Sequence, residues 1–241
     1  MIQRAQRDAG KVASVIHQKI ADKLQPGVNL LEIESLVEAM IDKAKMSPAF
    51  KGYKGYPAAT CLSVNSAVVH GIPTNYSLKE GDIIGIDFGV ENDGWIVDCA
   101  RTHGIGTLKP KTAALLETTK RALDEAITLC RAGRRLGDLG HQIQTVVEKA
   151  GFYIIRELTG HGVGRQLQEP PTIPNYGLPG RGPTLKPGQT IAIEPITALR
   201  PTSVTLLPDG WTVVAQDAVI SAHFEDTIAI TQAQPHILTR D

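Results

Sequence analysis

Two aspartates, Asp87 and Asp98, each stand inside an apolar run, and a strong hairpin signal joins the two runs. The stretch Ile84–Asp98 reads Ile-Gly-Ile-Asp-Phe-Gly-Val-Glu-Asn-Asp-Gly-Trp-Ile-Val-Asp, which is typical of two strands around a two-residue turn. If Asn92 and Asp93 form the turn, Asp87 lies directly opposite Asp98. If Asp93 and Gly94 form it, Asp98 lies opposite Gly89, with Asp87 diagonal to it on the same face. Either register places two carboxylates together, which requires a raised pKa or a cation between them.

An internal repeat supplies a second strand that carries a carboxylate. Residues 27–44 resemble residues 133–150, and Leu78–Asp87 resembles Leu185–Glu194 at an offset one residue larger. This register aligns Glu194 with Asp87. Shared patterning of apolar and polar residues could produce such a match by chance, but the matching acids argue against that. We therefore expect two related α+β halves, each supplying a histidine and a strand carboxylate to a shared centre.

Glu225 is another acid inside an apolar run, His223–Ile230, and we expect it to be the counterpart of Asp98. Four carboxylates (Asp87, Asp98, Glu194 and Glu225) and one or two histidines would then converge. Such a cluster is not buried without cations. Oxygen ligands with an imidazole suit Mn, Fe, Co or Zn, and this many ligand groups favour two ions. Two neighbouring ions can deprotonate a shared water and polarise a carbonyl, which is hydrolytic chemistry.

The elements that must position these residues follow from the hydrophobic periodicity. Helical spacing covers 2–24, about 30–44 behind an Asn29/Glu32 capping box, 112–131 and 138–150. Extended patterns cover 60–69, 152–158, 190–196, 211–215 and 223–231, whereas Gly and Pro crowd 170–188 and indicate a long loop. We expect one domain over residues 1–241, with pseudo-repeat halves of about 1–110 and 111–241.

Composition excludes several classes of function. Lys+Arg and Asp+Glu balance at 25 each in 241 residues, so there is no basic footprint for nucleic acid or an anionic membrane. The three cysteines are odd in number and lack a CxxC spacing, which indicates a reducing compartment. The sequence has no apolar run of the length that a membrane span needs. We therefore expect a cytoplasmic protein that needs neither nucleic acid nor a membrane.

Together these motifs resemble the type I methionine aminopeptidases, which are metallopeptidases of the pita-bread fold. The matching motifs are Cys61–Pro73, the Asp87/Asp98 hairpin, Gly160–Gly164, Ile193–Pro195, Asp209–Thr212 and Ser221–Thr227. The resemblance implies an α+β fold in which two pseudo-symmetric halves share a central curved antiparallel sheet backed by helices. It implies a methionyl aminopeptidase that hydrolytically removes N-terminal methionine from nascent proteins and peptides and prefers a small second residue. In this family, a water or hydroxide bridged by two metal ions attacks the scissile carbonyl.

The resemblance also implies roles for individual residues. The implied metal ligands are Asp87, Asp98, His161, Glu194 and Glu225. Asp98 and Glu225 would bridge two divalent ions (Co, Mn, Fe or Zn). Glu194 would accept the proton of the attacking water, and His70 would hydrogen-bond the scissile amide and assist proton movement.

A substrate pocket, a further ion and partners follow from the same resemblance. The residues that match the methionine pocket are Tyr53, Tyr56, Cys61 and Trp211, joined by His70. An apolar, aromatic slot suits a thioether, and Phe50 and Lys54 change the expected mouth of this pocket. A monovalent cation is implied near Asn65 and Ser221. The implied partners are nascent polypeptide N-termini, with association with the ribosome left open, and the implied state is a monomer.

Gln168 departs from the family pattern, which has a substrate-contacting histidine seven residues after His161. We expect Gln168 to take this catalytic and substrate-binding position, but an amide donates a hydrogen bond without carrying a proton, so turnover should be slower than in relatives. His223 shares the face of Glu225 on an undistorted strand and could compensate. Two alternatives remain: an X-Pro aminopeptidase-like enzyme, or a low-activity or non-catalytic binding protein on the same fold.

Overall fold

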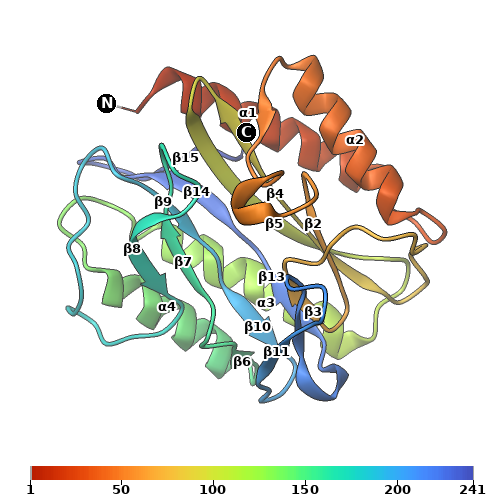
Figure 1. Ribbon diagram of the computed structural model, residues 1–241. Coiled ribbons are helices and arrows are strands. Elements are labelled where there is room, and N and C mark those ends of the chain that lie inside the picture. Colours follow the sequence, from red (N-terminus) through yellow and green to blue (C-terminus); the bar gives the residue numbers. More distant parts are fainter. Residues whose placement is uncertain (1, 241) are drawn as a thin grey trace.

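The computed structural model describes residues 2–240 as helices and antiparallel strands (Figure 1). Met1 and Asp241, the ends of the predicted domain, lie outside the described residues. The helices are α1 (Arg4–Ala21), α2 (Leu30–Lys43), α3 (Pro110–Ile127) and α4 (Leu136–Lys149), with short 3₁₀ turns η1 (Tyr53–Gly55) and η2 (Gln216–Ala218). The strands are β1 (Ser47–Pro48), β2 (Cys61–Val64), β3 (Ala67–Val69), β4 (Ile83–Asn92), β5 (Trp95–Gly104), β6 (Tyr153–Ile154), β7 (Thr159–Gly162), β8 (Glu169–Pro174), β9 (Thr190–Ile193), β10 (Ile196–Ala198), β11 (Val204–Leu206), β12 (Val213–Ala215), β13 (Ser221–His223), β14 (Asp226–Ala229) and β15 (His236–Ile237).

A long, curved hairpin of β4 and β5 forms the centre of the first half (Figure 1). Its turn consists of Asp93 and Gly94, whose φ angles are positive at 50° and 71°. Glycine adopts such angles freely and aspartate tolerates them, as a hairpin turn of this hand requires. The turn selects the second predicted register, in which Asp98 lies opposite Gly89 and Asp87 is diagonal to Asp98 on the same face.

The internal repeat is visible in the backbone hydrogen bonds. The N–H of Gly27 donates to Leu78 O at 2.7 Å, and the N–H of Gly133 donates to Leu185 O at 3.0 Å. Helices α2 and α4 follow these two contacts, and each has 14 residues. The two halves therefore share one unit, in which a helix is followed by a strand with an acid in it (Asp87 in β4) or directly after it (Glu194 after β9).

The halves meet where β5 runs beside the segment that leads into β14. Ala100 and Glu225 exchange backbone hydrogen bonds of 3.3 and 2.9 Å. Five residues after Ala100, the N–H of Ile105 donates at 2.8 Å to the carbonyl oxygen of the residue before β4. Five residues after Glu225, the N–H of Ile230 donates at 2.8 Å to the carbonyl oxygen of the residue before β9. These contacts match Ala100 with Glu225 and Ile105 with Ile230, residue by residue, and we call this matching of the two halves the junction alignment. It makes Ala100 the backbone counterpart of Glu225, so the expected pairing of Glu225 with Asp98 is wrong.

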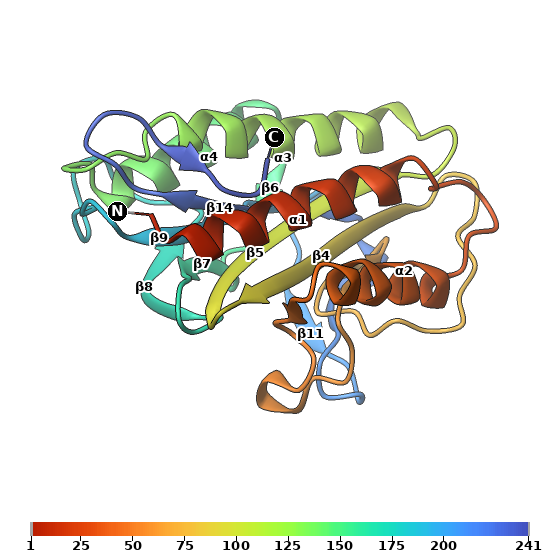
Figure 2. The same ribbon diagram turned by 90° about the horizontal axis from the view of Figure 1, so that it is seen from above.

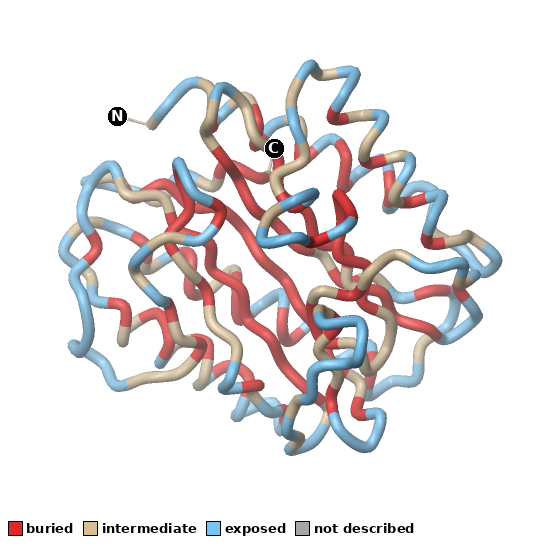
Figure 3. The backbone as a smooth tube through the Cα atoms, in the orientation of Figure 1, coloured by how far each residue is buried: buried red, intermediate tan, exposed pale blue. Residues whose placement is uncertain are grey.

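Helices cover one face of the strands. Ile16 of α1 and Val37 of α2 belong to the same buried cluster as Ile86 of β4, and Leu123 of α3 packs in a second cluster with Ile193 of β9. Figure 2 shows α1, α3 and α4 on one side of the strands, and the η1 loop and β11 on the other. The strands through the middle of the molecule are the most continuously buried segments (Figure 3). Within residues 2–240, every helix is too short or too polar to span a bilayer.

The predicted loop over 170–188 begins with a strand, which corrects the expectation there. β8 pairs with β7 at the edge of a five-stranded sheet. Prolines lack an N–H donor, but an edge strand needs hydrogen bonds on one side only. The prolines at 170, 171 and 174 therefore hid a strand that tolerates them.

Candidate active site

One cavity of about 210 Å³ collects the residues that the sequence suggested. Eleven of the predicted site residues line it: Tyr53, Tyr56, Cys61, His70, Asp87, Asp98, His161, Gln168, Glu194, Trp211 and Glu225. Phe50, Lys54 and His223 line it too, as do Val69 and Leu167. Val69 and Leu167 were not anticipated, and the only signal for them is that each precedes an anticipated residue in the chain.

Asp98 is tied to the second half of the molecule through Thr227. The backbone N–H of Asp98 donates to Thr227 Oγ1 at 2.8 Å, and the same hydroxyl donates to Asp98 O at 2.8 Å. Thr227 has no solvent exposure. One buried hydroxyl therefore satisfies both backbone groups of Asp98 and fixes its position relative to β14.

The second half presents its two glutamates where its strands are interrupted. Glu194 lies between β9 and β10, which together replace the single strand predicted over 190–196, and its backbone carbonyl accepts from Asn175 Nδ2 at 2.8 Å. Glu225 lies between β13 and β14, where its backbone pairs with Ala100 of β5. Both acids are buried, with residue exposures of 9% and 2%. The strand breaks thus place two acids beside the hairpin that carries Asp87 and Asp98.

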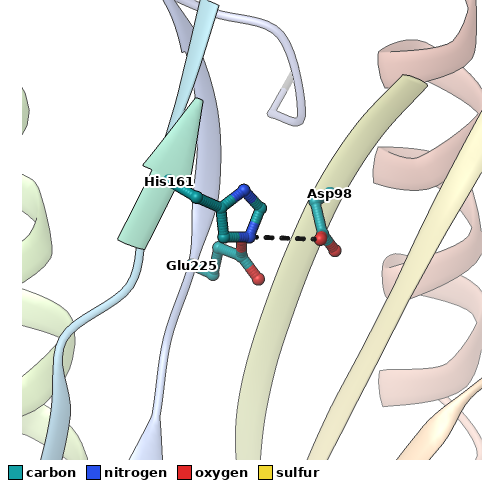
Figure 4. A group of neighbouring side chains, drawn as sticks. All are labelled: Asp98, His161 and Glu225. Carbon is teal, nitrogen blue, oxygen red and sulfur yellow. Dashed lines mark ion pairs between the residues drawn. The ribbon is translucent and has the colours of Figure 1, made fainter. Parts of the chain in front are cut away.

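His161 on β7 directs one nitrogen at this acid cluster. Its Nε2 lies 3.8 Å from Asp98 Oδ2 and 3.4 Å from Glu194 Oε1. Its Nδ1 lies 3.0 Å from Gly162 O, which can only accept, so Nδ1 carries the proton and the Nε2 lone pair faces the acids. Ligand atoms of Asp98, His161 and Glu225 lie within 4.8 Å of one another, and Figure 4 shows the three side chains converging.

Burial raises the pKa of every carboxyl group in the cluster. Burial and the charge of Glu194 raise the pKa of Asp98 to about 7, and burial raises that of Glu194 to about 7. Burial and neighbouring carboxylates raise the pKa values of Asp87 and Glu225 well above the usual range. One oxygen each of Asp87, Asp98 and Glu225 is buried without a hydrogen-bond partner. Divalent cations would satisfy these oxygens and offset the repulsion, and carboxylates with one imidazole are a donor set that such ions accept.

His70 lines the same cavity as the acids and belongs to the first half. It follows β3 with a positive φ of 58°, and the next residue is a glycine because a Cβ on Gly71 would lie 2.5 Å from Leu62 O. Burial, His223 and His161 lower the pKa of His70 to about 4. At neutral pH its ring is therefore uncharged and has one N–H to donate.

An apolar wall lies beside the acids. The Tyr56 ring centroid is 5.0 Å from that of Trp211 at an interplanar angle of 78°, and 6.5 Å from that of Phe50 at 83°. Such edge-to-face pairs are favourable packing for aromatic rings. Burial and a nearby carboxylate raise the pKa of the Cys61 thiol well above its usual value, so it stays protonated, and Tyr53 packs on the same cluster. The wall offers aromatic edges and a neutral thiol to an apolar side chain.

Gln168 lies at the edge of the cavity, and the two other predicted residues, Asn65 and Ser221, lie beyond it. Gln168 is exposed where it lines the cavity, so it lies at the mouth. Asn65 and Ser221 adjoin each other, with the Ser221 N–H donating to Asn65 O at 3.2 Å. Neither Asn65 nor Ser221 is among the lining residues, so a monovalent ion held there would be separate from the acid cluster.

Comparison with known proteins agrees with this geometry. Residues 4–232 match metallopeptidase family M24. The chain is 43% identical to methionine aminopeptidase 1 of Bacillus subtilis over 234 residues, which is 97% of this chain and 94% of that protein. The crystal structure of a Thermotoga maritima methionine aminopeptidase matches with a TM-score of 0.97 at 42% identity over 100% of both chains. A Pyrococcus furiosus prolidase, at a TM-score of 0.80 and 22% identity over 65% of that chain, shares the fold. The chain therefore belongs to metallopeptidase family M24 and, within it, to the methionine aminopeptidases of the pita-bread fold.

Proposed function

We propose that the protein removes the N-terminal methionine from polypeptides by metal-dependent hydrolysis. The observation that carries this proposal is the joining, in one small cavity, of four buried carboxylates and an imidazole with an aromatic, apolar wall. The acids supply a site for cations, and the wall supplies a slot for one apolar side chain. Relatives at more than 40% identity are methionine aminopeptidases.

The metal ligands of the proposed enzyme are Asp87, Asp98, His161, Glu194 and Glu225. Two divalent ions from the set Mn, Fe, Co and Zn would fit this mainly oxygen donor set, and Asp98 and Glu225 would serve as ligands to both. When bound, the ions supply a water that loses its proton near neutral pH and polarise the scissile carbonyl. A monovalent cation near Asn65 and Ser221 is a separate part of the proposal.

The chain's own groups divide the remaining work. Glu194 accepts the proton of the attacking water, the role that the resemblance to the methionine aminopeptidases implies for it. His70, uncharged at neutral pH, donates its N–H to the scissile amide. Gln168 at the mouth donates its amide N–H to the substrate backbone but moves no proton. Tyr53, Tyr56, Cys61 and Trp211 enclose the methionine side chain.

The proposed substrates are polypeptide N-termini, including those that emerge from a ribosome. Action as a monomer is part of the same proposal. The three cysteines are buried and free, which supports a location in the reducing cytoplasm.

A peptidase assay tests this function directly. Metal-depleted protein is loaded in turn with Mn, Fe(II), Co and Zn and given Met-Ala-Ser or an X-Pro peptide. We expect release of methionine from Met-Ala-Ser with at least one ion. Asp98→Asn should abolish release, whereas Asp93→Asn, an equivalent change in the exposed hairpin turn, should retain it. Cleavage of the X-Pro peptide alone would point to the other enzyme class, and no cleavage with any ion would point to a binding protein.

A further inference from the structure

His223 lines the cavity, and none of the roles in the proposed function uses it. It is 4% exposed, and its Nε2 lies 3.4 Å from Glu194 Oε2 and 3.9 Å from Glu225 Oε2. That nitrogen is buried without a hydrogen-bond partner in the described chain. A buried polar atom is rarely left without a hydrogen-bond partner. A partner of this nitrogen is therefore expected among the residues of the cavity.

The backbone N–H and C=O of His223 both hydrogen-bond to one threonine hydroxyl, as those of Asp98 do. Thr102 Oγ1 accepts from the His223 N–H at 3.0 Å and donates to His223 O at 2.6 Å. Thr227 makes the same two bonds to Asp98. The junction alignment matches Thr102 with Thr227, and therefore matches His223 with Asp98. His223 thus enters the cluster from the second half at the position that Asp98 occupies in the first.

The equivalence also identifies the partner of His223. Asp98 is the neighbour of Asp87 across the hairpin, and Glu194 is the repeat counterpart of Asp87. An imidazole with its proton on Nε2 has one N–H to offer, and Glu194 Oε2, at 3.4 Å, is the nearer of the two carboxylate oxygens beside that nitrogen.

We infer that His223 is a positioning residue of the metal site, whose Nε2–H donates to Glu194 Oε2 and holds that carboxylate toward the proposed ions. One oxygen of Glu194 then faces His223, and the other, Oε1, faces His161. Metal-binding carboxylates depend on such outer hydrogen bonds for their orientation, and losing one weakens metal binding or activity by about 10-fold or more. The inference rests on the proposed function, since it needs a cation at Glu194.

Substitutions that keep or remove the donor test this inference. His223→Leu removes the N–H at similar volume, whereas His223→Gln retains an amide N–H of similar reach. His103→Leu is the matched control, because His103 also carries a buried, unpaired Nε2 but does not line the cavity. Co(II) titration of each metal-free protein, followed by calorimetry and by visible absorption, measures affinity and ligand geometry without substrate.

We expect H223L to bind the more weakly bound of the two Co(II) ions about 10-fold less tightly than the parent, with an altered absorption spectrum. The affinity of H223Q for that ion should stay within about threefold of the parent's. H103L should bind as the parent does. Co(II) binding by H223L at parental affinity would overturn the inference, as would an equal loss in H223Q and H223L. If H223L does not fold, His223→Asn, whose shorter amide cannot reach Glu194, replaces it with the same expectation. A parent that binds Co(II) but releases no methionine would count against the proposed function alone.

Discussion

Removing one charge from the buried acid cluster should stabilise the metal-free protein. Asp98→Asn keeps the shape of the side chain and removes its charge. Burial and Glu194 raise the pKa of Asp98 from the ordinary value of 3.8 to about 7, so the ionised group opposes folding at neutral pH. We therefore expect D98N to be more stable than the parent without metal, although it removes a proposed ligand.

The pKa shift sets the size and the sign of this effect. One pKa unit corresponds to about 1.4 kcal/mol, so a rise from 3.8 to about 7 gives an upper limit of about 4 kcal/mol. Neighbouring groups and entering water relax around a buried ion, so we expect about 2 kcal/mol, or roughly 5 °C in Tm. The pKa of Asp98 is higher in the folded state than in the unfolded state. The protonated carboxyl therefore contributes fully to the free energy of unfolding below about pH 4, and this contribution is lost as the pH rises to about 7. The advantage of D98N should be small near pH 4 and largest near pH 8.

Urea unfolding of EDTA-treated protein at about pH 4.5 and about pH 8 measures this difference. Asp82→Asn is the control, because Asp82 is also buried but lies outside the cavity. Burial pushes its pKa up, yet hydrogen bonds from Asn65, the Lys79 N–H and Tyr76 hold it below the usual value. D82N should therefore lose stability at pH 8, where D98N gains it. A D98N protein that gains nothing at pH 8, or gains equally at both pH values, would refute the reasoning.

Two further substitutions test single contacts. Gln168→His should raise kcat on Met-Ala-Ser by about 10-fold, because an imidazole can carry a proton, and should leave Co(II) affinity unchanged; an unchanged or lower kcat would contradict this. Thr227→Val keeps the shape of the side chain but leaves both backbone groups of Asp98 without their hydroxyl partner. We expect a loss of about 2 kcal/mol in urea unfolding together with weaker Co(II) binding, and parental values for both would show that this contact contributes nothing.

The sequence predicted the central hairpin but did not decide its register. Two apolar runs around Asn92–Gly94 predicted the hairpin but left two registers open, and both put Asp87 and Asp98 on one face. The choice rests on the turn: Asp93 and Gly94 take positive φ angles, which glycine allows more readily than any other residue. A stricter use of turn chemistry would have selected this register before any coordinates.

The missed strand β8 has a different cause. Its three prolines and the glycines that follow have the composition of a loop, and composition does not reveal whether a strand lies at the edge of a sheet or in its middle. Prolines are excluded only where both sides of a strand need donors. Because β8 pairs on one side with β7, tertiary position overrides the local signal.

The mistaken counterpart of Glu225 shows where matching residue types fails. Asp98 and Glu225 are both acids inside apolar runs, and this likeness alone suggested that they are counterparts. The backbone hydrogen bonds instead pair Ala100 with Glu225, and the two threonine contacts pair Asp98 with His223. Reciprocal bonds between the halves fix the positions of these backbones, whereas the side chains there are free to differ. The site is therefore asymmetric in its ligands although its frame is symmetric, and an imidazole in one half can stand where the other half has a carboxylate.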